Sequence, residues 1–212
     1  VVTFSRAGFL TLATIFLLYL WRAIRRGRVA WAATTVVLAA CGFAALPGGY
    51  TERLATITNI EADPTGSAQE RWSDTVAALR FVARHPLVGA GLGMNILALN
   101  EARGPLWKEV HNVYLEFAAD LGLPGLILFV ALMVLCLRAT LEIQRRTAGD
   151  PRRCDLFLLG EGLQIGLTAF AVAAMFHPVA YHLYFYYMAG LALGGRAAAR
   201  EASREQAPMR AT

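Results

Sequence analysis

The fold of this chain is decided by the stretch HNVYLEFAADLGLPG (residues 111–125), in which a polar loop runs directly into a long apolar segment. Read at helical pitch, one face of this stretch carries His111, Tyr114, Leu115 and Ala118. An imidazole, which titrates near neutral pH, therefore lies at the mouth of a membrane span. It either belongs to a functional site or only ends a loop by hydrogen bonding to a backbone carbonyl.

The composition is that of an integral membrane protein. Hydrophobic residues make up 57% of the chain and charged residues only 17%, and the apolar residues occur in blocks. Five blocks approach the length of about 20 residues with which a helix crosses a bilayer, at residues 9–21, 29–46, 123–137, 156–176 and 179–194. We therefore predict an all-α, polytopic membrane protein with about five transmembrane helices.

Arginine-rich segments define the orientation of these spans. One lies between the first two spans, one lies between the third and fourth, and one follows the fifth (Arg22, Arg25, Arg26 and Arg28; Arg138, Arg145, Arg146, Arg152 and Arg153; Arg196, Arg200, Arg204 and Arg210). Positive residues are retained on the cytoplasmic side, and all three segments agree with one topology. The net charge of +5 is thus a topology signal, without the basic face and stacking aromatics of a nucleic-acid interface.

This topology divides the chain into four parts. Residues 1–46 form two transmembrane helices, residues 47–110 an outer loop, residues 111–195 three further transmembrane helices, and residues 196–212 a cytoplasmic tail. The sequence starts inside an apolar run, without an initiator methionine or a signal-peptide pattern. We expect it to be the C-terminal part of a longer membrane protein.

The outer loop contains a short amphipathic helix. Ser67 and Glu70 have the capping-box spacing that begins a helix. The His-Pro pair at residues 85–86 ends it, because the residue before proline disfavours helical backbone. The helix displays Arg71 near its N-terminus, either for a ligand or in a solvated pair with Asp74 at i+3.

Other candidate motifs indicate structure and not a cofactor. GAGLG at residues 89–93 is a weak signal for phosphate binding without a preceding strand, and it predicts tight backbone turns against the membrane domain. His177 and His182 flank a proline, but no third and fourth ligands accompany them, so we expect neither a metal nor a cofactor. The aromatic run at residues 181–187 is typical of an interfacial belt.

Positive side chains and one imidazole gather on the outer side. Arg6 lies at the outer end of the first span, and Arg71 and Arg84 lie on the outer helix, ahead of His111. Guanidinium forks donate paired hydrogen bonds to a diphosphate and stay charged. A histidine beside them can take the proton of an attacking hydroxyl. For Arg6 the alternative is that its side chain snorkels to the membrane interface.

The order of several short motifs resembles that of the O-antigen ligase/polymerase-like family. These motifs are SRAG at residues 5–8, RW at 71–72, HPLVGAG at 85–91, HN at 111–112 and GLPG at 122–125. The resemblance covers about residues 3–195, which correspond to the C-terminal half of the proteins in this family.

The resemblance implies a metal-independent, inverting glycosyltransferase with a GT-C-like fold in the bacterial inner membrane. The implied donor is a glycan on undecaprenyl diphosphate, and the implied acceptor, on the periplasmic face, is the lipid A core or another glycan. By the family pattern, Arg6 and Arg71 bind or activate the diphosphate, His111 assists acceptor deprotonation, and Asn112 positions the site. Residues 126–127 are Leu-Ile where the family often has small hydroxyl residues, so ligase and polymerase are equally compatible.

Two other classes of protein stay open. Transporters and channels carry ionisable residues near the bilayer midplane and broken helices in repeated halves. The middles of the predicted spans are nearly charge-free, with Glu161 at the inner end of the fourth as the nearest exception. A non-catalytic membrane scaffold is the other class, and it tolerates free replacement of both arginines and of His111.

Overall fold

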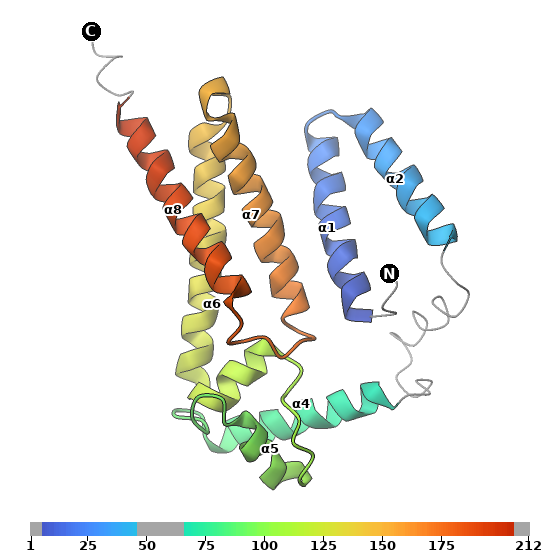
Figure 1. Cartoon of the computed structure of the whole chain (residues 1–212), viewed down its shortest axis with the longest axis vertical. Helices are drawn as coiled ribbons and strands as arrows, with labels where there is room; N and C mark the ends of the chain where they lie inside the picture. Colours follow the sequence, from blue (N-terminus) through green and yellow to red (C-terminus); the bar gives the residue numbers. More distant parts are fainter. Residues whose placement is uncertain (1–5, 46–65, 206–212) are drawn as a thin grey trace.

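A computed structural model of the chain describes residues 6–45 and 66–205, and every regular element within these ranges is helical (Figure 1). The elements are α1 (Arg6–Arg25), α2 (Val29–Ala44), α4 (Ser67–Arg84), α5 (Asn95–Arg103), α6 (Val113–Thr147), the 3-10 turn η2 (Pro151–Arg153), α7 (Cys154–Ala173) and α8 (Leu183–Glu205). The predicted all-α class is confirmed. The parts of the sequence-based predictions that fall on Ser5, residues 46–65 and Arg210 lie outside the described residues.

Three helical segments are long and apolar enough to cross a membrane: Ala7–Arg25, Val113–Thr147 and Pro151–Ala173. They correspond to the first, third and fourth predicted spans. The helix α2 is apolar but has 16 residues, which at 1.5 Å per residue reach about 24 Å of a hydrocarbon core about 30 Å thick.

The fifth predicted span differs most from the structure. Its start at residue 179 is wrong, because residues 179–182 are not helical and α8 begins at Leu183. Its apolar first half continues directly into a charged second half that ends at Glu205. The count of five spans and the GT-C-like arrangement therefore stay predictions.

The core of the bundle lies between α6, α7 and α8, where aromatic rings pack across the helices. The ring centroid of Phe129 on α6 lies 4.5 Å from that of Phe117 and 5.2 Å from that of Phe185 on α8. Phe185 in turn lies 5.4 Å from Phe170 on α7. In a membrane such close packing, and not the exclusion of water, holds helices together. Figure 1 shows α1 running along α7, with α2 on the far side of α1.

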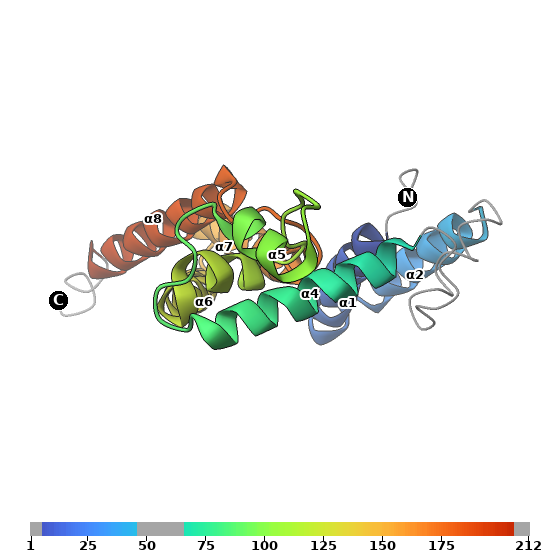
Figure 2. The ribbon, with the colours of Figure 1, turned by 90° about the horizontal axis from the view of Figure 1, so that it is seen from below.

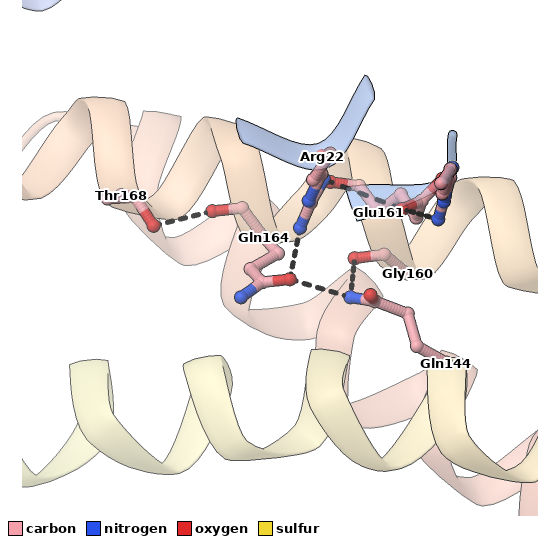
Figure 3. A network of polar contacts seen from close by, with 7 residues as sticks. Arg22, Gln144, Gly160, Glu161, Gln164 and Thr168 are labelled. Carbon is pink, nitrogen blue, oxygen red and sulfur yellow. Dashed lines mark hydrogen bonds and ion pairs between the residues drawn. The ribbon is translucent and has the colours of Figure 1, made fainter. Parts of the chain in front are cut away.

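A polar network joins α1 to α7 and α6 near the arginine-rich loops (Figure 3). Arg22 donates to the backbone carbonyl of Glu161 at 3.3 Å and to the side-chain oxygen of Gln164, and Arg26 donates to the Glu161 carboxylate at 2.9 Å. Gln144 of α6 donates to the same Gln164 oxygen at 2.8 Å. The Glu161 side chain is only 11% exposed. Two guanidiniums compensate its charge, which explains an acidic residue inside a predicted span.

We expect Glu161→Ala to destabilise the bundle by roughly 2–4 kcal/mol, because it leaves the two guanidiniums without their counter-charge. Glu142→Ala is the matched control, since Glu142 also bonds two arginines, Arg146 and Arg200, but at an exposed edge where ion pairs contribute little. Thermal unfolding in detergent measures both. Equal losses of stability in the two variants would contradict the role assigned to the network.

The outer part of the structure lies at the end of the bundle opposite the arginine-rich loops, which we call the outer end. There α4 crosses beneath the bundle, with α5 beside it (Figures 1 and 2). The predicted stop of α4 is confirmed, since α4 ends at Arg84. The predicted capping box is wrong. The N-cap is Gly66, with φ of 67°, and the Glu70 carboxylate accepts a bond from Lys108 at 2.8 Å.

Candidate active site at the outer end of the bundle

The helix α6 is interrupted near its start by Gly122, whose φ of 70° and ψ of −174° are not helical. The interruption leaves backbone groups of the flanking turns without helical partners, and residues 85–94 bind them. The backbone bonds, of 2.7 to 2.8 Å, run from Ala90 N to the Ala119 carbonyl, from Gly91 N to the Asp120 carbonyl and from Leu123 N to the Pro86 carbonyl. The interruption therefore falls in the GLPG motif at residues 122–125.

Two glycines allow the two backbones to meet. A Cβ atom on Gly89, which has φ of 69°, would lie 2.6 Å from the Ala119 carbonyl oxygen. A Cβ atom on Gly122 would lie 2.6 Å from the carbonyl carbon of Leu87. Each glycine therefore faces the backbone of the other segment, and the prediction of tight turns against the membrane domain is confirmed. We call this contact the glycine junction.

A buried carboxylate, Asp120, ties the junction to its neighbours. Its side chain accepts bonds from the backbone N–H groups of Gly93 (2.9 Å) and Asn95 (2.6 Å), at the start of α5, and from the Tyr181 hydroxyl (2.7 Å). Burial and this bond to Asp120 raise the pKa of Tyr181, which stays a donor at neutral pH. Tyr181 thus makes an internal bond, in addition to any place in the belt predicted for residues 181–187.

The segment between α7 and α8 is fastened to the same part of α6. Val113 N donates to the Ala174 carbonyl at 2.8 Å, and the Tyr114 hydroxyl donates to the Ala171 carbonyl at 2.9 Å. Further along, Ala180 N donates to the Glu116 carboxylate at 3.2 Å. These bonds hold residues 174–180, and His177 among them, beside the HN motif that begins α6.

Two imidazoles and a guanidinium lie within electrostatic range of one another here. His111 is half-buried, and its Nδ1 atom is buried without a hydrogen-bond partner among the described residues. Burial, and then the positive charge of Arg71, lower the pKa of His111. Burial, followed by the charges of Arg71 and His111, lowers the pKa of His177. The structure therefore places Arg71 of α4 within electrostatic range of two imidazoles that are neutral at neutral pH.

The charge of Arg71 is not compensated by the residue expected to pair with it. Asp74 instead binds Arg103 of α5, and the two side chains are only 5% and 7% exposed. Arg103 approaches Asp74 within the packed interface of α4 and α5, so the solvated i+3 pair is wrong. Arg71 is exposed and forms no ion pair within residues 6–45 and 66–205. Its guanidinium is available to an anion.

The other predicted site residues occupy different positions. Asn112 is the N-cap of α6, and its side-chain oxygen accepts the Leu115 N–H at 3.1 Å, which leaves the amide NH2 group unused by the cap. The helix α1 begins at Arg6 at the outer end (Figure 1), but the Arg6 side chain is not among those described. Arg84 lies 13 residues beyond Arg71 on α4, about 20 Å along the axis, so it does not join the site.

The fold and this site define a helical membrane protein with a cationic, imidazole-bearing face at one end of its bundle. A family model described as O-Antigen ligase matches residues 1–130, and the chain belongs to that family. The match includes Arg71 and His111, whereas His177 lies beyond it. The comparison with curated proteins gave no match. Family membership makes this a membrane protein of the O-antigen ligase type, a class that works on glycans and lipid-linked substrates.

Proposed function

We propose that this chain carries the active site of an inverting glycosyltransferase, which moves a glycan from undecaprenyl diphosphate to a sugar hydroxyl on the periplasmic face of the inner membrane. The observation that supports this most is the guanidinium of Arg71, which forms no ion pair among the described residues and lies within electrostatic range of the neutral imidazole of His111, both within the family match. Ligation to the lipid A core and polymerase-type extension of a glycan use the same chemistry.

On the donor side, Arg71 binds the diphosphate. Its planar fork donates paired hydrogen bonds to phosphate oxygens and cannot lose its charge at neutral pH. As the bond between the anomeric carbon and the phosphate oxygen breaks, the electron pair moves onto the diphosphate, and a fixed positive charge stabilises it. Arg6, at the outer start of α1, supplies a second cation to the same group.

On the acceptor side, His111 is the base. The acceptor hydroxyl oxygen attacks the anomeric carbon from the face opposite the diphosphate, so the configuration inverts, and its proton passes to the His111 imidazole. The ring is neutral at neutral pH because burial and Arg71 lower its pKa. Asn112, with its amide NH2 free of the helix cap, orients the acceptor.

This assignment predicts the pH dependence of transfer. A lowered pKa means that His111 is protonated, and lost as a base, only below the ordinary histidine value of about 6.5. The acid limb of the profile of kcat/KM therefore lies below that value. Arg71→Gln removes the neighbouring charge, so the acid limb of its residual activity shifts to higher pH. Arg71→Lys keeps the charge, so its acid limb stays at the lower pH of the wild type. A limb that is the same in both variants would contradict the assignment.

The function itself is tested by glycolipid analysis of a strain that lacks the gene. Polymer left unattached on its lipid carrier identifies a ligase, whereas single repeat units on the core identify a polymerase. The wild-type gene restores the normal product, and the Arg71→Gln variant does not. Substrate flux in proteoliposomes without any sugar transfer would instead indicate the transporter class.

A further inference from the structure

A polar cavity lies on the outer part of the structure, between the last turns of α4 and the helix α5, which run side by side (Figure 2). Its volume is about 300 Å³, and its charged and aromatic lining consists of Arg80, Phe81, Arg84, His85 and Glu101. The small side chains of α5 that complete the lining, at residues 98 and 102, leave this space open.

The cavity carries excess positive charge. Arg80 and Arg84 are exposed neighbours at i and i+4, an arrangement in which like charges repel. Neither forms an ion pair within the described parts of the chain. By contrast, Arg22 and Arg26, which are also four residues apart, share the carboxylate of Glu161. The lining has two guanidiniums and one carboxylate, so the cavity has a net positive charge that favours binding of an anion.

The cavity also has an aromatic wall. The rings of Phe81 and His85 are stacked, with centroids 4.5 Å apart and planes inclined by 26°. Apolar walls with a few polar groups are the usual make-up of small-molecule sites. The apolar face of a sugar ring fits such a wall, and a carboxylate or phosphate on that ring reaches the guanidinium forks beside it.

This cavity is separate from the site around His111. Arg80 follows Arg71 by nine residues on α4, which is about 14 Å along the axis and half a turn around it. The two arginines therefore point to opposite sides of the helix. A diphosphate held by Arg71 cannot reach Arg80, so an anion in the cavity belongs to a different part of the reaction complex.

We propose that the cavity between α4 and α5 is an anion-binding subsite for an acidic sugar, bearing a carboxylate or a phosphate, of the acceptor glycan. The proposal rests on the proposed function for its choice of acceptor. It assigns Arg80 and Arg84 to the acid group and Phe81 to the sugar ring. The subsite then selects acidic glycans over neutral ones.

Equilibrium binding without a donor tests this. The protein in phosphatidylcholine nanodiscs is titrated calorimetrically with trigalacturonate and with neutral maltotriose. We expect the wild type to prefer the acid, with affinity that falls as salt rises. The Arg80→Gln/Arg84→Gln variant binds trigalacturonate about ten-fold more weakly or worse, because two charge-assisted contacts are lost. Arg138→Gln/Arg145→Gln, with the same change in charge at exposed positions of α6, retains wild-type affinity.

Equal affinity of Arg80→Gln/Arg84→Gln and wild type for trigalacturonate overturns the proposal. The variant could instead bind trigalacturonate as the wild type does and bind less phosphatidylglycerol in nanodiscs that contain this lipid. In that case the ligand is a lipid headgroup and the proposed acceptor subsite is wrong. The His111→Ala protein should bind trigalacturonate normally. Binding therefore reports on the subsite whether or not transfer occurs, and a failure of the proposed function is seen separately in the glycolipid analysis.

Discussion

Replacing His111 with alanine lowers glycan transfer by at least about a hundred-fold, while the amount of folded protein in the membrane stays unchanged. General-base catalysis contributes about 10² to 10⁴ in rate, and all of that contribution is lost with the imidazole. Stability is little affected, because the ring is half-buried, its Nδ1 atom has no partner among the described residues, and the substitution removes only a bond to the backbone of Glu109. Kinetics of the purified protein and quantitative immunoblots of membranes measure the two quantities.

His182→Ala is the control for this experiment. His182 lies on the same outer segment as His177 but is exposed, and its ring stacks on Tyr184 at 5.7 Å. It should keep normal transfer. The transfer rate of His177→Gln should lie between those of His111→Ala and His182→Ala, because His177 is close enough for its pKa to respond to Arg71 and His111. Normal surface glycan in cells whose only copy of the gene carries His111→Ala would show that His111 is not the base.

The site shows which features can be predicted from a sequence. The positions of the apolar blocks predict that Arg71 and His111 lie on the same side of the membrane. The structure brings these two together. The break at Gly122 falls in the GLPG motif, where two glycines and a proline occur within four residues, and such clusters favour an interruption of the helix.

Other features depend on contacts that no local pattern encodes. Asp120 reads as one acidic residue in an apolar helix, and its role becomes visible only when Gly93 and Tyr181, from distant segments, bond to it. His177 is likewise a loop residue in the sequence, and the bond from Val113 to Ala174 brings its segment to the site.

The wrong predictions have the same cause. The i+3 spacing of Arg71 and Asp74 and the capping-box spacing of Ser67 and Glu70 are rules for an isolated helix. In the folded chain, Asp74 forms its ion pair with Arg103, and Glu70 forms its ion pair with Lys108. Arg103 is already ordered in the packed interface of α4 and α5, so it loses less conformational entropy on pairing with Asp74 than the exposed Arg71 would.

Substitution of Gly122 by alanine should be the most destabilising single change at the outer end of the bundle. An L-residue at the φ of 70° and ψ of −174° of Gly122, a region used almost only by glycine, costs about 1–3 kcal/mol. The new Cβ also lies 2.6 Å from the carbonyl carbon of Leu87, and this backbone cannot move without breaking the bonds of the glycine junction. We expect a total loss of roughly 3–5 kcal/mol, seen as a lower unfolding temperature in detergent, together with loss of transfer.

Gly93→Ala separates the clash from the backbone strain. Gly93 lies on the loop of residues 85–94 that packs against Gly122 and has a similar φ of 72°, but a Cβ atom there meets nothing within 4 Å. Its alanine variant therefore carries only the strain of about 1–2 kcal/mol. Gly89→Ala, which clashes with the Ala119 carbonyl from the other side, should resemble Gly122→Ala and not Gly93→Ala. If all three variants lose the same stability, the close approach of the two backbones does not hold the site together, and positive φ alone explains these glycines.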